Sequence, residues 1–585
     1  MRAPSRDREK GIMWKTIAYS VLFHGLMAAS LFAVVYGADS VVRFGIVGHK
    51  GANVYYDAYH GARHLWNRDN QRYYVAYHTV SGYNRFYKML QENGYDVHVE
   101  TYKPFNRRIL NRYQVFFVGE ETYHARFMSE EEQKDLIAWV KDGGGLFAIA
   151  EHTNAHYMAE VMNLLFKDLP IRVREDSICD LEQPGPVSPD WVDLPIAKDH
   201  PVTKGVKEYR FFNGSSLDTP HGVLLSSDTS WSDKSNPEDR PIQNGNKERD
   251  PDEIAGPLAG VAAFGYGKGR VVVIADHNAL SNPTLYWGDH HRFAMNTMDW
   301  LAGRRLNLDG LFIPAGLLAL LGIYFTRRRW RPILHASRYT LLAAGIAACA
   351  AVAVFYLARP SYVDIFVHVG NNSDMKYMTK KKGGFFTLYG QWTKEPNLRP
   401  WASRSLTSGY DALFLSAPRR AYSDPQMSII DGYLHRGRTV VYLATIDSLE
   451  SEAGDQLMNK FGFKADINRD LKMNGKKPLN VWGPRKWTDS IFRFYVHPDT
   501  PGVTVKGLDP VVYLTRGGYH ISERQEHSGK HLFEVLSEKR VGRGKFMMVA
   551  PIEIWNDRGL NNLYTDSDVV QQQMSEFAIR LASNL

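Results

Sequence analysis

The stretch Gly143-Gly-Gly-Leu-Phe-Ala-Ile-Ala-Glu-His-Thr-Asn154 is the part of the chain from which the fold can be predicted. A glycine triplet ends a helical pattern, an apolar run follows it, and the run stops at Glu151 and His152. This order predicts a helix, a tight turn, a buried parallel strand and a loop at the carboxyl end of that strand. Ligands of open α/β sheets bind at the carboxyl ends of the strands, so Glu151 and His152 are predicted to lie at a ligand site.

Strands and helices alternate through residues 39–305, which predicts a doubly wound parallel sheet. One strand is expected over residues 41–47, ahead of a polar, tyrosine-rich stretch, and another over residues 270–275. This topology brings three groups of polar side chains to one edge of the sheet. The candidate ligand-binding residues are Asp57, His60, Glu151, His152, Asn154, Asp276, His277 and Asn278.

These residues suit three roles. In the first hypothesis they form a metal or acid–base site, because histidine and carboxylate side chains from separate loops are usual ligands of zinc. A divalent metal such as zinc is then the candidate cofactor, and it would lower the pKa of a bound water and permit hydrolysis. The candidate metal ligands are His152, His277, Asp57 and His60, and the candidate catalytic residues are Glu151, His152 and Asp276.

In the second hypothesis the same edge binds a ligand without chemistry. Aromatic side chains with interspersed polar groups suit a carbohydrate or a peptide-like envelope component. The aromatic residues of this stretch are Tyr55, Tyr56, Tyr59, Trp66, Tyr73, Tyr74 and Tyr77. The purely structural alternative is that the tyrosines pack the protein's own loops, and that Glu151 and His152 form only a hydrogen-bonded pair.

Cysteine content and charge placement restrict the function further. The chain has 585 residues, two cysteines and a formal net charge of +8. Two cysteines allow neither a disulfide framework nor a cysteine zinc motif. Several basic residues lie near the N-terminus and at residues 327–331, beside apolar runs. That placement indicates membrane topology, and no nucleic-acid partner is expected.

Three apolar runs are each predicted to span a lipid bilayer. They are residues 16–38, 309–326 and 339–358. The basic segments 1–15 and 327–338 are placed in the cytoplasm by the positive-inside rule. Residues 39–305 and 360–585 then lie in the periplasm, or otherwise outside the cytoplasm, and the protein is a predicted multi-pass protein of the inner (cytoplasmic) membrane. The alternatives are cleavage of the first run as a signal peptide and a buried hairpin formed by the other two.

The second large segment, residues 360–585, repeats the order of elements of the first. The repeat indicates two copies of one domain rather than a solenoid. Alanine and threonine at 444–445 replace the residues at 151–152, and proline and isoleucine at 551–552 replace those at 276–277. A polar site is therefore predicted in the first copy only.

The ordered motifs resemble the class I glutamine amidotransferase-like fold. More narrowly, they are similar to a non-catalytic group of bacterial membrane proteins with GldG-like and GIFT-like domains. The motifs that carry the resemblance are Asp57-Ala-Tyr-His-Gly61, the Gly143–Gly145 turn, His200-Pro-Val-Thr-Lys-Gly205, Gly267-Lys-Gly-Arg270 and Asp276-His-Asn-Ala-Leu-Ser-Asn282. The resemblance implies two flavodoxin-like, amidotransferase-like domains joined by transmembrane helices. Glu151 and His152 stand where the related enzymes carry a nucleophilic cysteine, so amidotransferase activity is not expected.

The resemblance also implies a role. It is that of a membrane-anchored accessory and ligand-binding subunit of an envelope transport or surface-assembly system, associated with an ABC transporter or with polysaccharide export. The expected partners are subunits of a membrane complex, a carbohydrate or envelope polymer, and the lipid bilayer. No Walker motif is evident, so this chain is not expected to hydrolyse ATP. The alternative is a metal-dependent hydrolase with its site in the first domain.

Overall fold

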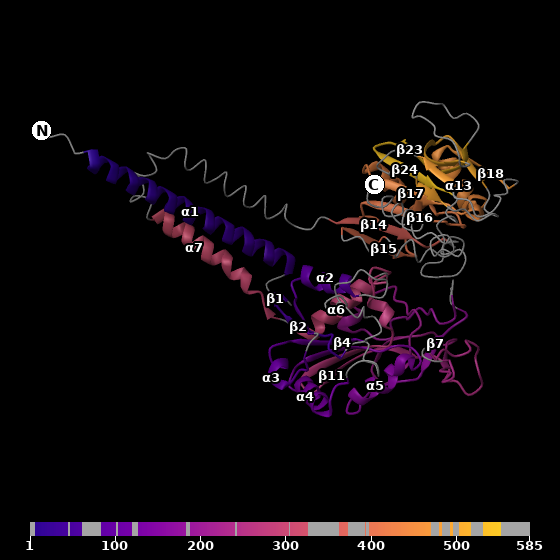
Figure 1. The fold of residues 1–585 in the computed structure, drawn as a ribbon, viewed down its shortest axis with the longest axis horizontal. Coiled ribbons are helices and arrows are strands. Elements are labelled where there is room, and N and C mark those ends of the chain that lie inside the picture. The colour runs from indigo at the N-terminus through magenta and orange to yellow at the C-terminus, as the bar shows by residue number, and fades with distance from the viewer. Residues whose placement is uncertain are drawn as a thin grey trace.

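The computed structural model describes seventeen stretches of the chain, and every structural statement below refers to them. They are residues 6–44, 47–48, 50–60, 83–100, 103–119, 127–182, 188–239, 243–282, 284–303, 305–325, 362–371, 392, 397–469, 479–482, 492–494, 502–515 and 531–550. Two regions that each contain a large sheet lie beyond one end of a long helix pair (Figure 1). We call residues 50–303 the first sheet region and residues 362–550 the second sheet region.

The first sheet region contains a mixed sheet with strand order β3-β2-β4-β5-β12-β11-β8-β6, and β9 also pairs with β11. The parallel strands are β2 (Asn53–Asp57), β3 (Asp96–Glu100), β4 (Val115–Gly119), β5 (Gly145–Ile149) and β12 (Gly269–Ile274). The antiparallel part consists of β11 (Ala259–Tyr266), β6 (Arg172–Val173), β8 (Leu217–Asp218) and β9 (Gly222–Leu225). The helices are α2 (Asn84–Glu92), α3 (Arg107–Leu110), α4 (Glu130–Lys141), α5 (Met158–Leu165) and α6 (His290–Ala302). The predicted parallel α/β sheet is therefore present in this region.

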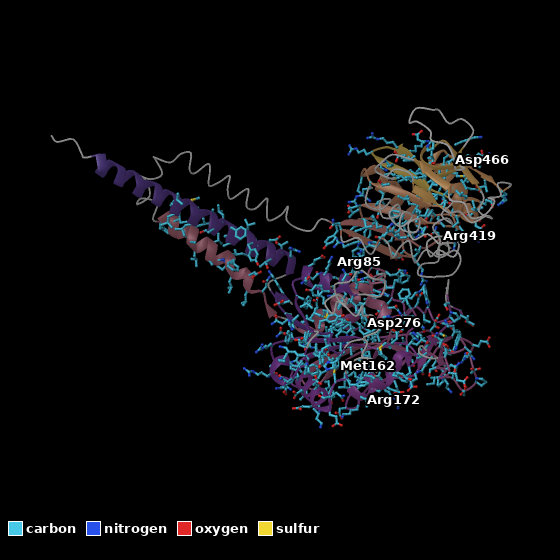
Figure 2. All side chains as sticks on the ribbon, in the orientation of Figure 1. Arg85, Met162, Arg172, Asp276, Arg419 and Asp466 are labelled. Carbon is cyan, nitrogen blue, oxygen red and sulfur yellow. The ribbon has the colours of Figure 1, made fainter. Side chains whose placement is uncertain are left out.

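The second sheet region contains a sheet with strand order β15-β14-β16-β17-β24-β23-β22-β19-β20. Its parallel strands are β14 (Val363–His368), β15 (Leu398–Ser403), β16 (Ala412–Ser416), β17 (Thr439–Leu443) and β24 (Gly544–Val549). The antiparallel strands are β19 (Leu479–Trp482), β20 (Phe492–Phe494), β22 (Asp509–Thr515) and β23 (His531–Val541). Five parallel strands followed by one antiparallel strand occur in the same order in both sheets. Figure 2 places Met162 and Asp276 in the first region and Arg419 and Asp466 in the second.

The strand predicted over residues 41–47 was wrong. Residues 41–44 are the end of α1 (Arg6–Phe44), and the strand that enters the first sheet is β2, at Asn53–Asp57. The last turns of α1 pack against the chain that follows the first sheet, where Nδ2 of Asn307 donates to the carbonyl oxygen of Ser40 at 3.3 Å and to its Oγ at 3.2 Å, so residues 41–44 stay helical. Tyr55 and Tyr56 are consequently strand residues rather than part of a polar loop.

Among the described residues, two helices are long and apolar enough to cross a membrane. The candidate spans are Val21–Arg43, within α1, and Leu308–Phe325, which includes α7 (Phe312–Phe325). The first lies about five residues later than the predicted run, and the second matches its prediction closely. The third predicted run, residues 339–358, lies outside the described residues. α1 and α7 lie side by side and extend away from the first sheet region (Figure 1).

Each glycine of the Gly143–Gly145 turn meets a different requirement. Gly143 has φ +129°, a value that side-chain-bearing residues rarely adopt. A Cβ on Gly144 would lie 2.4 Å from the ring of Trp139, and a Cβ on Gly145 would lie 2.6 Å from the carbonyl oxygen of Leu301. The turn therefore brings β5 close to both α4 and α6.

We expect Gly145→Ala to lower the free energy of unfolding by about 1–3 kcal/mol, because the new methyl group meets backbone that cannot move aside easily. Chemical denaturation of the full-length protein checks this. Gly265→Ala is the matched control, since a Cβ there would meet only the Gly269 carbonyl oxygen at 3.8 Å. Equal stability of the two variants would contradict the packing argument.

Candidate functional site

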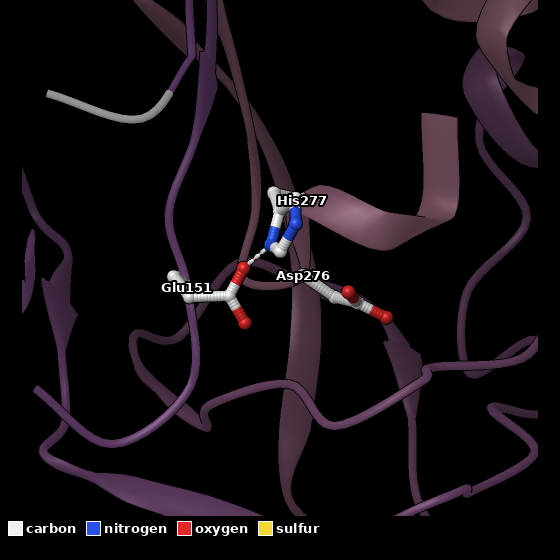
Figure 3. Close-up of side chains that lie close together, drawn as sticks. All are labelled: Glu151, Asp276 and His277. Atoms are coloured by element: carbon white, nitrogen blue, oxygen red, sulfur yellow. Dashed lines mark ion pairs between the residues drawn. The ribbon is translucent and has the colours of Figure 1, made fainter. Parts of the chain in front are cut away.

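The ends of β5 and β12 bring part of the candidate site together, namely Glu151, His152, Asp276 and His277. The two strands are parallel neighbours, with Ile149 opposite Ile274. Both strands end after this pair, so Glu151 and Asp276 leave the sheet at the same level. Figure 3 shows the Glu151 carboxylate directed at the His277 ring, while the Asp276 carboxylate points away from that pair. The predicted convergence at these two strand ends is thus a feature of the structure.

Glu151 lies between two histidines. Its Oε2 atom contacts Nδ1 of His277, and its Oε1 atom lies 3.4 Å from Nε2 of His152. Oε1 also accepts a hydrogen bond of 3.0 Å from the backbone N–H of His152. Glu151 is only 2% exposed. A carboxylate that is so far removed from water needs charged or hydrogen-bonding partners, and the imidazoles provide them.

Asp276 holds the backbone that carries His277. It precedes the 3₁₀ turn η4 (His277–Leu280), and its Oδ1 atom accepts a 2.8 Å hydrogen bond from the N–H of Asn278. Its Oδ2 atom accepts a 2.6 Å hydrogen bond from the N–H of Phe212. Burial raises the pKa of Asp276 to about 7, although these backbone donors favour the ionised form. A carboxyl group with a pKa this far from its ordinary value often marks a functional site.

Glu151, Asp276 and His277 could hold a metal ion. Their ligand atoms all lie within 4.8 Å of one another. Zinc bonds of about 2.0–2.2 Å require donor atoms closer together than this, so Asp276 would have to turn toward the Glu151–His277 pair. His152, on the other oxygen of Glu151, is an alternative third ligand. The donor types fit zinc. Of the four predicted metal ligands, His277 belongs to this group, and His152 contacts Glu151 beside it.

The other two predicted ligands, Asp57 and His60, belong to a separate cluster. Nδ1 of His60 lies 2.7 Å from Oδ2 of Asp57, and Nε2 lies 3.3 Å from Oε1 of Glu132. His60 is fully buried, and both of its ring nitrogens face carboxylates. The structure therefore does not bring Asp57 and His60 into the metal-type group with Glu151. They form a buried carboxylate–histidine–carboxylate bridge between the end of β2 and α4.

Glu132 was not among the predicted site residues. The sequence signal was the Ser129-x-x-Glu132 pattern, which correctly predicts the start of a helix. Both halves of this capping box are present, because Oγ of Ser129 accepts from the N–H of Glu132 at 3.2 Å and Oε2 of Glu132 accepts from the N–H of Ser129 at 2.9 Å. The other carboxylate oxygen of Glu132, Oε1, lies beside His60. Only the packing of α4 beside β2 shows this second contact.

Two other predicted ligand-binding residues have local partners. Nδ2 of Asn154 donates to Oε1 of Glu160 at 2.9 Å, near the start of α5. Nδ2 of Asn278 donates to the carbonyl oxygen of Phe212 at 3.2 Å, beside Asp276. Asn154 and Asn278 are thus engaged in shaping the loops that follow β5 and β12.

The predicted aromatic ligand surface does not include Tyr55 and Tyr56. They are 1% and 3% exposed, and the Tyr55 ring stacks on Phe116 with centroids 5.2 Å apart. Alternation along β2 buries both rings on opposite faces of the sheet. Tyr59 is half-buried beside His60. The remaining aromatics of this prediction, which are Trp66, Tyr73, Tyr74 and Tyr77, lie outside the described residues.

One protein family and several solved structures are similar to parts of this chain. Residues 79–298 match a protein family described as a domain of unknown function (DUF4350). Curated proteins gave no match. Among solved structures, the N-terminal domain of mmIFT52 is 12% identical with a TM-score of 0.31, and the match covers 43% of this chain and 97% of that one.

A cytoplasmic protein from Salmonella typhimurium LT2 is 14% identical with a TM-score of 0.27, and the match covers 42% of this chain and 98% of that one. A ThuA-like protein from Bacteroides uniformis is also 14% identical, with a TM-score of 0.26 and coverage of 43% and 91%. At these identities and scores the similarities do not inform the function.

Proposed function

We propose that this protein is a membrane-anchored accessory and ligand-binding subunit of an envelope transport or surface-assembly system, associated with an ABC transporter or with polysaccharide export. The observation that carries the proposal is the buried Glu151–His277 pair, with Asp276 beside it, at the carboxyl edge of the first sheet. At the matching strand end of the second sheet, Ala444 is apolar and Thr445 caps a short helix. Among the described residues, the Glu151 strand end is ionisable and the matching strand end at Ala444 is not, and this difference suits a binding region joined to a docking region.

Amidotransferase activity forms no part of the proposal. Such chemistry needs an accessible thiolate at the nucleophile position, and Glu151 and His152 lie there instead. Cys179 lies in β7 (Asp176–Cys179), is fully buried, and burial raises the pKa of its thiol. The other cysteine, Cys349, lies outside the described residues. Cys179 is therefore poorly suited to replace the missing nucleophile.

The anchor is proposed to be the α1–α7 pair together with the third apolar run, residues 339–358. Gly37 and Gly316 support close packing of the pair, since a Cβ on Gly37 would lie 3.0 Å from Ile313 and one on Gly316 would lie 2.7 Å from Val34. Apolar side chains such as Leu318, which is 67% exposed, are left to face lipid. Both sheet regions then lie outside the cytoplasm, and the basic loop 327–338 lies inside.

Reporter fusions test this topology. A compartment-sensitive reporter fused after Leu306 is expected to report the periplasmic side, and one fused after Arg331 is expected to report the cytoplasm, because the second span separates them. A fusion after Lys50 serves as a control for the side of the first sheet region. Identical signals from Leu306 and Arg331 would contradict a second span.

The accessory role is tested by crosslinking of the full-length protein in its native membrane, followed by mass spectrometry. The expected result is a reproducible set of crosslinks to subunits of a transport or export complex. A chain that migrates as a monomer on native gels in mild detergent and yields no intermolecular crosslinks would contradict the proposal.

A metal-dependent hydrolase is the second candidate function. The observation that favours it is the group formed by Glu151, Asp276 and His277, whose residue types suit zinc and whose ligand atoms lie within 4.8 Å of one another. A bound ion would supply a water of lowered pKa as nucleophile. Zinc-loaded protein that hydrolyses no ester, amide or phosphate test substrate would leave binding as the role of this group.

A further inference from the structure

The edge of the second sheet lies against the loop that follows the candidate site. Ala402 of β15 forms a bridge with Trp287 of the first sheet region. The N–H of Ala402 donates to the carbonyl oxygen of Tyr286 at 3.0 Å, and the N–H of Gly288 donates to the carbonyl oxygen of Ala402 at 2.7 Å. The loop 281–289 connects η4 to α6, and at Trp287 it thus pairs alongside β15, the edge strand of the second sheet.

Arg85 strengthens the same contact from the first sheet region. Its side chain is buried and donates from Nη2 to the carbonyl oxygen of Leu398 in β15 at 2.8 Å. Its backbone N–H donates to Oδ1 of Asn282, in the loop 281–289, at 3.0 Å. One residue therefore joins the second sheet to the loop beside the site, and Figure 2 shows Arg85 at the junction of the two regions.

Arg404 adds a charged contact. Its Nη2 atom lies 2.6 Å from Oδ2 of Asp193, and its Nε atom lies 3.5 Å from Oε1 of Glu208. Oγ of the neighbouring Ser403 donates to Oε2 of Glu208 at 2.6 Å. Burial raises the pKa of both carboxyl groups, and the Arg404 charge opposes that effect. Glu208 is therefore paired with a cation from the second region, and Asp193 lies between that cation and Arg210 of the first region.

The segment Glu208–Phe212 connects this contact to the site. Arg210 forms a bridge with Asp193, and its Nε atom lies 2.6 Å from Oδ1 of that residue. Two residues later, the N–H of Phe212 donates to Asp276 at 2.6 Å. Glu208, at one end of this short segment, thus contacts the second sheet region, and Phe212, at the other end, contacts the carboxylate that caps the His277 turn.

We propose that docking of the second sheet region on the loop 281–289 sets the affinity of the Glu151–Asp276–His277 site for its ligand. The inference rests on the proposed function, in that this site binds a ligand. With β15 and Arg404 in place, the loop after His277 and the segment that holds Asp276 are both restrained before binding. Without them, ligand binding must order both segments, and affinity falls accordingly. By linkage, a bound ligand must also stabilise the docked arrangement by the same factor.

The test uses the full-length protein in detergent and zinc as the probe. Arg404→Met is expected to weaken zinc binding about 10-fold, within the usual range of coupling between sites. It is also expected to speed amide hydrogen exchange over residues 276–289. Arg404→Lys, which keeps the charge, should fall between Arg404→Met and the wild type. Arg419→Met is the matched control, because the Arg419–Asp447 pair of the second region is exposed, with side chains 43% and 67% accessible.

Unchanged zinc affinity and unchanged exchange in a folded Arg404→Met protein would overturn the inference. If that variant does not fold, Ser403→Ala removes a single hydrogen bond to Glu208 and is judged by the same two readouts. If the wild type binds no zinc, the metal assignment of the site fails separately. Hydrogen exchange without ligand then decides the coupling: faster exchange over residues 276–289 supports it, and wild-type exchange refutes it.

Discussion

Replacing Glu151 with glutamine is expected to weaken zinc binding by the full-length protein at least about 100-fold. Glu151 contacts both His152 and His277. The substitution therefore removes one candidate ligand and also the carboxylate that orients these two imidazole rings. Loss of outer-shell partners alone typically lowers metal affinity 10- to 100-fold, and loss of a ligand should lower it further. Isothermal titration and metal analysis of the purified protein measure the effect.

Two comparisons make this result specific. Glu131→Gln changes an exposed carboxylate of α4 and should bind zinc as the wild type does. His152→Ala combined with His277→Ala should lose the ion entirely. A wild-type protein that contains no metal, and whose melting temperature is the same with and without chelator, would eliminate both the metal site and the hydrolase candidate. Stoichiometric zinc without hydrolysis would favour the binding role.

The second large effect is expected at the buried bridge of the first sheet region. His60→Ala should lower the free energy of unfolding by about 3–5 kcal/mol, because it leaves the carboxylates of Asp57 and Glu132 buried without their shared partner. Denaturant unfolding measures the loss. Glu130→Gln, on the same helix, changes an exposed side chain that lies 3.6 Å from Lys134 and should have little effect. Similar losses in both variants would contradict the assignment of a buried bridge.

The same bridge predicts a dependence on pH. Burial opposes ionisation of Glu132, but hydrogen bonds from His60 and Ser129 outweigh it and hold the pKa of Glu132 below its ordinary value of 4.5. A carboxyl group with a lowered pKa stabilises the folded state above its unfolded pKa, and this contribution is lost as the pH falls through the folded pKa. The wild type should therefore be more stable than Glu132→Gln at neutral pH, and the difference should shrink below about pH 4.5. A constant difference from pH 7 to pH 3 would refute this origin.

Part of the fold follows directly from local sequence patterns. The Gly143–Gly145 turn, the strand after it and the capping box at Ser129 could be predicted because backbone conformation, burial and capping depend on residues close in sequence. Two of the three predicted spans likewise correspond to helices long enough to cross a membrane, and the third lies outside the described residues. Topology alone then placed Glu151 and Asp276 at one edge of the sheet, since parallel neighbouring strands end together.

The membership of the site could not be predicted in the same way. Asp57 and His60 were grouped with Glu151 by strand order, yet Nε2 of His60 lies 3.3 Å from Glu132, because the first turn of α4 lies beside the segment that follows β2. The continuation of α1 moved the first strand of the sheet to residues 53–57, which turned Tyr55 and Tyr56 into core residues. Such outcomes depend on strand register and helix position, where a shift of one residue reverses the direction of a side chain.

The sequence by itself determined most of the central elements, the two apolar helices, and the contrast between an ionisable strand end at Glu151 and an apolar one at Ala444. Only the tertiary structure decided that Glu151 lies between His152 and His277, that His60 is enclosed by two carboxylates, and that Arg404 of the second sheet region reaches acids beside the site. The physical reason is the distance in sequence over which the deciding interactions act. Turns, caps and apolar periodicity are set by neighbours in the chain, whereas most partners of these buried charges come from segments that are distant in the sequence.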